Sequence, residues 1–143
     1  MKIFVITEKE NISNIKEILK SLAPETEVGF IASEDIKKLD KTVDDETQLV
    51  FNYDNQEVRS SLRHFEIKKF SFGFLEKADF FASDQINTEA GISFKLNYNG
   101  NSVPIWVKSP FDKERIYNFL AALCVGIISG KSVIEMSEKL KNL

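Results

Sequence analysis

The sequence predicts an α/β fold: a mainly parallel sheet with helices on both faces, next to a small antiparallel sheet or hairpin. Two observations lead to this fold class. In the first half of the chain, short apolar runs alternate with segments of helical periodicity, a pattern typical of right-handed β-α-β units. In the second half, apolar and polar residues alternate on both sides of an Asn99-Gly100 turn, which indicates an antiparallel hairpin.

The first half should contain four strands separated by helices. Apolar side chains at helical spacing predict a helix over residues 11–22, which Pro24 ends. A shorter helix should begin at Ser33, and another at Asp54, where Glu57 completes a variant of the capping box. Short apolar runs bounded by polar residues predict the strands, at residues 2–7, 27–32, 47–53 and 68–74.

The second half should contain the hairpin and two helices. Its strands are expected at residues 92–98 and 103–107, with residues 79–83 as a third strand. A long apolar helix should end at Gly130, and a last helix should run from Val133 towards Leu140. Ser132 is the expected N-cap of this last helix, with Glu135 as its capping-box partner.

The composition excludes several classes of function. A length of 143 residues predicts that residues 1–143 form a single domain. The net charge of −3 provides no positive field for nucleic acid. One Cys and one His are too few for a disulfide framework or a Cys/His zinc site. Because no run approaches the ~18 apolar residues of a membrane span, we expect a cytoplasmic protein that binds neither nucleic acid nor a membrane.

Two positions are candidates for ligand binding. Ligands of open α/β sheets bind outside the carboxyl ends of the strands, where Asn52 and Asp54 could hydrogen-bond a sugar or a base. The alternative for Asp54 is that it only caps the helix it precedes. Asn118 is the second candidate, because an amide early in a strongly apolar helix is not explained by helix propensity. Its alternative is to face water.

Other chemical motifs are explained without a function. Residues 125–132 resemble a phosphate-binding loop, but three residues instead of four separate the glycines, and the stretch ends a helix. The segment after the first strand, residues 7–11, has no glycine and carries two glutamates. The acidic run Asp44-Asp45-Glu46 is interpreted as a solvated loop, Cys124 as a core residue and His64 as a surface residue. No catalytic residue and no metal site are predicted.

A family resemblance appears in residues 47–143. Residues Leu49–Asn55, followed by Glu57–Arg59, resemble the "LNADD…VR" strand-to-helix step of the Mur ligases, ATP-dependent enzymes that add amino acids to the peptidoglycan precursor. Further segments are similar to that family in the same order: Phe72–Phe74, Gly91–Phe94, Tyr117–Ala122 and Ser132–Glu135. Residues Tyr117–Ala122 match the family's motif "YNALAA". The resemblance implies the second half of the central, ATP-binding domain of these enzymes.

The resemblance also implies a ligand and a limited activity. The family's adenine-binding asparagine matches Asn118, so weak binding of ATP or ADP is expected, with Asn52 and Asp54 at the neighbouring strand end. The family's "HNxxN" His and Asn fall on Glu114 and Arg115. Its phosphate-binding loop, its magnesium-binding Glu and His, its carbamylated lysine and its flanking domains have no counterpart here. We therefore expect a non-catalytic or accessory Mur-ligase-like domain.

Two alternative functions stay open. In the first, the chain is a protein–protein interaction module without nucleotide binding, whose sheet edge or Phe-rich surface contacts a protein partner or a second copy of the chain. In the second, it is a fragment of a longer, active Mur ligase.

Overall fold

The computed structural model describes residues 2–108 and 112–143. Its strands are β1 (Lys2–Thr7), β2 (Val28–Ala32), β3 (Thr47–Asn52), β4 (Lys68–Gly73), β5 (Phe80–Thr88), β6 (Gly91–Tyr98) and β7 (Asn101–Val107). Its α-helices are α1 (Ile12–Leu22), α2 (Leu39–Thr42), α3 (Gln56–Leu62), α4 (Lys113–Ile128) and α5 (Val133–Lys141). Two 3-10 helices, η1 (Lys9–Asn11) and η2 (Ser33–Lys38), precede α1 and α2.

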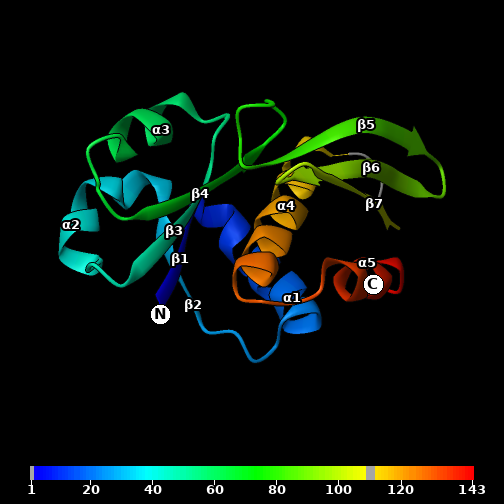
Figure 1. The fold of residues 1–143 in the computed structure, drawn as a ribbon, viewed down its shortest axis with the longest axis horizontal. Coiled ribbons are helices and arrows are strands. Elements are labelled where there is room, and N and C mark those ends of the chain that lie inside the picture. The colour runs from blue at the N-terminus through cyan, green and yellow to red at the C-terminus, as the bar shows by residue number, and fades with distance from the viewer. Residues whose placement is uncertain (1, 109–111) are drawn as a thin grey trace.

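The parallel part of the sheet has helices on both faces, as predicted. Strands β2, β1, β3 and β4 are neighbours in that order and pair in parallel. Because successive side chains of a strand point to opposite faces, Val5 and Val50 pack with α1 and α4, whereas Ile6 and Leu49 pack with α2 and α3. Figure 1 shows α2 and α3 together beside the parallel strands, apart from α1 and α4.

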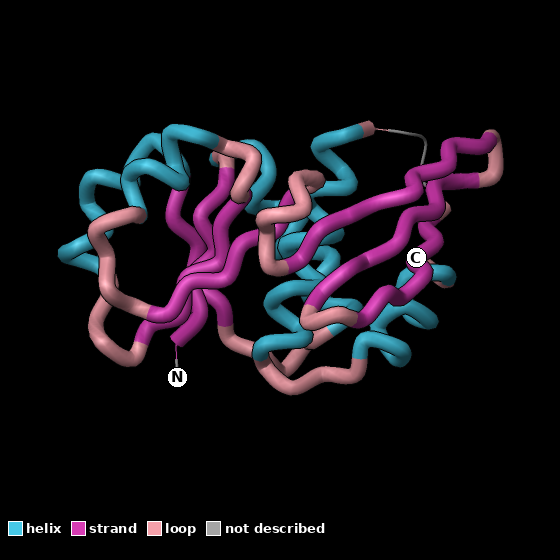
Figure 2. The backbone as a smooth tube through the Cα atoms, turned by 45° about the horizontal axis from the view of Figure 1, so that its top comes forward, coloured by secondary structure: helices cyan, strands magenta, loops and turns pink. Residues whose placement is uncertain are grey.

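The antiparallel strands continue the same sheet. The predicted antiparallel hairpin next to the parallel sheet is confirmed, and β5 joins it to that sheet by pairing in parallel with β4 through Phe72↔Phe80 and Gly73↔Phe81. Strands β5, β6 and β7 then follow as antiparallel neighbours, giving the order β2-β1-β3-β4-β5-β6-β7. Figure 2 shows this single twisted sheet running through the molecule. The predicted hairpin turn is confirmed, since Asn99 (φ 48°) and Gly100 (φ 77°) have the left-handed conformation that such a turn requires.

Helix α4 lies at the centre of the fold. It contacts α1, α5, β3, β4 and β5, and its residues from Leu120 to Val125 are completely buried. This burial explains why its sequence is apolar almost all round. The helix ends as predicted, with Gly130 at φ 94°, and Ser132 caps α5 by accepting a hydrogen bond from the Glu135 N–H at 3.3 Å.

Two predicted helix starts differ from the structure in detail. A helical segment does begin at Ser33, but it begins as the 3-10 helix η2, and no side chain caps it. Helix α3 begins at Gln56 and is capped by Asn55, whose Oδ1 accepts from the Val58 N–H at 3.1 Å. Asp54 does not cap α3, because its carboxylate binds other donors, described below.

Within residues 2–108 and 112–143, no helix combines the length and the apolar character that crossing a membrane requires.

Candidate functional site

The carboxyl ends of β1, β3 and β4 meet the first half of α4 around a small hollow. All three strands are parallel, so their carboxyl ends lie at one edge of the sheet. The hollow has a volume of about 50 Å³. Its polar lining residues are Thr7, Glu8, Asn11, Ser33, Asn52, Asn55, Glu114, Tyr117 and Asn118. The structure therefore brings Asn52 and Asn118, two of the predicted binding residues, to one hollow.

Asn118 connects α4 to the segment after β1. Its side chain is buried, so it does not face water. Its Nδ2 lies 3.5 Å from Oδ1 of Asn11, and Nδ2 of Asn11 donates to Glu114 at 3.1 Å. A separation of 3.5 Å is long for a hydrogen bond, so the Asn118 amide is only weakly held by Asn11. Asn11 was not predicted as a site residue, although it belongs to the segment that connects the first strand to the next helix, at the ligand-binding edge.

Asp54 connects β3, β4 and α4. Its Oδ2 accepts from the Phe74 N–H at 2.8 Å and from the Tyr117 hydroxyl at 2.7 Å, and its Oδ1 accepts from the Leu75 N–H at 3.3 Å. Its own N–H donates to Oδ1 of Asn52 at 2.9 Å. Asp54 thus supports Asn52 and the neighbouring chain segments, and it does not itself line the hollow.

Tyr117 is held as a neutral hydrogen-bond donor. Its ring packs edge-on against Phe74, with the ring centroids 5.1 Å apart, and the Lys113 ammonium lies 5.8 Å from its centroid. Burial raises the pKa of Tyr117 well above its usual value, and the Asp54 carboxylate raises it further. The hydroxyl therefore keeps its proton at neutral pH and fixes the start of α4 next to Asn118.

The hollow is acidic, which disfavours phosphate. Glu8 and Glu114 both line it, and none of its lining residues is Lys or Arg. The segment between β1 and α1 forms η1, in which the Asn11 N–H donates to the Glu8 carbonyl at 3.0 Å. This N–H is therefore not free to bind a phosphate oxygen.

A narrow groove reaches Asn118 from the other side. It lies between α1 and α4 and has a volume of about 100 Å³. Its lining residues are Asn14, Glu17, Ile18, Arg115, Asn118 and Phe119. Asn118 therefore lines both the hollow and the groove, and Arg115 supplies the groove with a positive charge.

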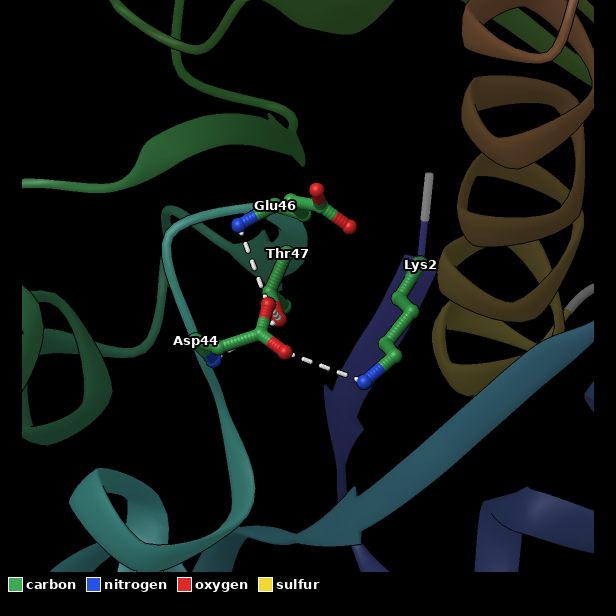
Figure 3. A network of polar contacts seen from close by, with 4 residues as sticks. All are labelled: Lys2, Asp44, Glu46 and Thr47. Atoms are coloured by element: carbon green, nitrogen blue, oxygen red, sulfur yellow. Dashed lines mark hydrogen bonds and ion pairs between the residues drawn. The ribbon is translucent and has the colours of Figure 1, made fainter.

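The acidic run at residues 44–46 has a structural role. Oδ2 of Asp44 accepts from the Lys2 ammonium at 3.0 Å, and its Oδ1 accepts from the Glu46 N–H at 3.0 Å (Figure 3). The Thr47 hydroxyl also donates to Oδ1, at 3.2 Å. These contacts, with Lys2 first, hold the pKa of Asp44 below its usual value. Asp44 thus fixes the loop before β3, and no group of three or more His, Cys, Asp or Glu residues suited to a metal occurs in the described part of the chain.

Cys124 lies in the core, as predicted. It is completely buried in α4, and this burial raises the pKa of its thiol well above the usual range. A protonated, enclosed thiol is a poor nucleophile. His64, in contrast, is exposed, as expected.

Solved structures of Mur ligases resemble this chain over almost its entire length. The MurF ligase of Thermotoga maritima, crystallised in complex with ADP, matches 99% of the chain with a TM-score of 0.76 and 14% identity. A MurF of Acinetobacter baumannii matches 98% of it with a TM-score of 0.74 and 12% identity. The UDP-N-acetylmuramate:L-alanyl-γ-D-glutamyl-meso-diaminopimelate ligase of Neisseria meningitides matches 96% of it, with a TM-score of 0.66 and 12% identity.

The chain has a Mur ligase fold. It spans about half the length of the two MurF proteins, covering 48% and 45% of them, and 64% of the Neisseria ligase. No family model matches the sequence, and no curated protein matches it. The predicted Mur-ligase-like architecture is therefore confirmed, and nucleotide binding at Asn118, Asn52 and Asp54 stays a prediction.

Proposed function

We propose that this chain is a non-catalytic accessory domain of Mur ligase fold, related to the ATP-dependent ligation of peptidoglycan precursors, that binds an adenine nucleotide weakly through Asn118. The observation that carries the proposal is the position of the Asn118 amide. It is buried, it lies between the hollow and the groove, and its contact with Asn11 is 3.5 Å long. An amide both donates and accepts hydrogen bonds, as the edge of adenine requires.

The small volumes of the hollow and the groove support weak binding. The hollow of about 50 Å³ and the groove of about 100 Å³ are both smaller than the roughly 300–1,000 Å³ of typical ligand sites. Entry of a base therefore requires side chains to move, and this movement reduces the affinity. In this proposal Asn52, which lines the hollow, bonds a ribose hydroxyl, and Asp54 acts by orienting Asn52.

The charge around the hollow supports a non-catalytic role. Forming an acyl phosphate requires groups that position the transferred phosphate and neutralise its charge. Glu8 and Glu114 line the hollow instead, and the Asn11 N–H is already bonded to the Glu8 carbonyl. We therefore expect no ATP hydrolysis and no amide formation by this chain.

The test is a titration of ¹⁵N-labelled protein with ADP, ATP and a UDP-sugar. We expect shifts of the Asn118 side-chain amide with ADP, at a dissociation constant on the order of 1 mM, and none with the UDP-sugar. Asn118→Ala should abolish the ADP response. Asn101→Ala, which removes an exposed amide on β7, should leave the response unchanged. Circular dichroism would confirm that both variants are folded. If no adenine nucleotide shifts any residue of the hollow or the groove, the binding proposal is wrong.

A protein-interaction role is a second candidate, favoured by the hairpin of β5 and β6. This hairpin extends from the rest of the molecule (Figure 1) and carries Ile86, which is 59% exposed. Light scattering distinguishes this role. A stable dimer that Ile86→Lys dissociates, with no effect of ADP on the melting temperature, would support it over nucleotide binding.

A further inference from the structure

A larger cleft lies between α1, α4, α5 and the end of β7. Its volume is about 420 Å³, which is within the roughly 300–1,000 Å³ range of small-molecule sites. Its lining residues are Glu17, Ile18, Lys20, Ser21, Val107, Lys108, Arg115, Phe119, Leu140 and Leu143. It is a different site from the acidic hollow, because the two have no lining residue in common.

The charged side chains of this cleft are mostly positive. Lys20 comes from α1, Lys108 follows β7, and Arg115 comes from α4, whereas Glu17 is the one acidic side chain among the described lining residues. The lining side chains therefore have two positive charges in excess, in a protein with a net charge of −3. In residues 2–108 and 112–143, none of these three cations forms an ion pair; those that do are Lys2, Lys95, Lys131 and Lys141.

The other lining residues are mostly apolar. Phe119 and Leu140 belong to the hydrophobic core, and Ile18 packs against that core. The cleft therefore combines an apolar surface with three cations that come from separate elements. A ligand that matches both features has an apolar or aromatic body and a compact anionic group.

We propose that this cleft binds a phosphate monoester with a small apolar or aromatic body. A phosphate monoester has a charge of about −1.5 to −2 near pH 7, which matches the excess of two positive side-chain charges. Arg115 can bond two phosphate oxygens at once, and Lys20 and Lys108 act as point charges. The body lies against Ile18, Phe119 and Leu140. The cleft shares Glu17, Ile18, Arg115 and Phe119 with the groove beside Asn118, but Asn118 itself does not line it.

Phenyl phosphate is the probe for the test, titrated into ¹⁵N-labelled protein. We expect shifts of the Ser21 and Val107 amides, and tighter binding than with inorganic phosphate or phenol. The triple variant Lys20→Gln, Lys108→Gln, Arg115→Gln should bind about tenfold more weakly or worse, because it removes every charge-assisted contact. All three side chains are exposed, so the variant should fold.

The matched control is Lys16→Gln, Lys37→Gln, Lys41→Gln, which removes the same charge from exposed positions outside the cleft. It should bind phenyl phosphate like the wild type, and Asn118→Ala should do the same. The inference is overturned if phenyl phosphate causes no shift at the cleft, if both triple variants lose affinity equally, or if inorganic phosphate binds as tightly as phenyl phosphate. Loss of ADP binding in Asn118→Ala with retained phenyl phosphate binding would separate the two proposals.

Discussion

The Tyr117 hydroxyl donates a 2.7 Å hydrogen bond to the Asp54 carboxylate, which lies 63 positions earlier in the chain. The same carboxylate oxygen accepts from the Phe74 N–H, so one side chain holds the ends of β3 and β4 against α4. Asn118 follows Tyr117 directly. The contact therefore sets the position of the candidate nucleotide-binding amide relative to the sheet.

Removing the Asp54 carboxylate should destabilise the fold more than removing the helix cap beside it. Asp54→Ala leaves the donors of Phe74, Leu75 and Tyr117 without their acceptor, at a cost of about 2–3 kcal/mol. Asn55→Ala removes only the cap of α3, at a cost of about 1 kcal/mol. Urea unfolding of both variants measures the difference. Equal losses would contradict the role assigned to Asp54.

Tyr117 should make the protein less stable at alkaline pH. In the unfolded chain, its phenol loses the proton near the ordinary pKa of 10.0, whereas burial and Asp54 raise the pKa in the folded state. Above pH 10 the folded state therefore binds more protons than the unfolded state, and the free energy of unfolding falls as the pH rises. The free energy of unfolding of Tyr117→Phe should therefore fall less steeply than that of the wild type between about pH 10 and pH 11.5. Urea unfolding at a series of pH values tests this, and identical slopes for both proteins would contradict it.

The strands could be predicted because their signal is local. Each apolar run of the parallel part became a strand, and the Asn99-Gly100 turn formed where its positive φ angles were expected. The pairing of β4 with β5 has no such signal. It depends on two residue pairs, Phe72↔Phe80 and Gly73↔Phe81, and it joins the expected antiparallel strands to the parallel sheet.

The role of Asp54 was mispredicted for a related reason. Asp54 and Asn55 are both good cap residues, so local preference does not decide between them. The deciding contacts are the N–H groups of Phe74 and Leu75 and the Tyr117 hydroxyl, which only the tertiary fold brings to Asp54. Asn118 was identified as a candidate by its unusual place in an apolar helix, but its burial depends on the packing of α4 against α1.

A glycine at position 73 is required by the Asp54 carboxylate. A Cβ atom at this position would lie 2.6 Å from Oδ1 and 2.8 Å from Cγ of Asp54. Gly73→Ala should therefore push the carboxylate away from its donors and cost about 1–3 kcal/mol. In an Asp54→Ala background the same substitution should cost much less, because the obstacle is gone. A double-mutant cycle measured by urea unfolding gives the coupling, and additive effects would show that Gly73 is required for another reason.

Lys2 should control the ionisation of Asp44. The Lys2 ammonium is the first cause of the lowered pKa of Asp44, and the Glu46 N–H and the Thr47 hydroxyl also lower it. Lys2→Ala should therefore raise the Asp44 pKa towards its ordinary value of 3.8 without reaching it. A carboxyl with a lowered pKa stabilises the fold above its unfolded pKa, and this contribution is lost as the pH falls through the folded pKa. The carboxyl ¹³C shift of Asp44 between about pH 2 and pH 6 follows the titration.

Lys41→Ala, which removes an exposed lysine that forms no ion pair within the described residues, is the control. An unchanged Asp44 pKa in Lys2→Ala would mean that the loop contacts alone hold the carboxylate, and that Lys2 adds no electrostatic link between β1 and the loop before β3.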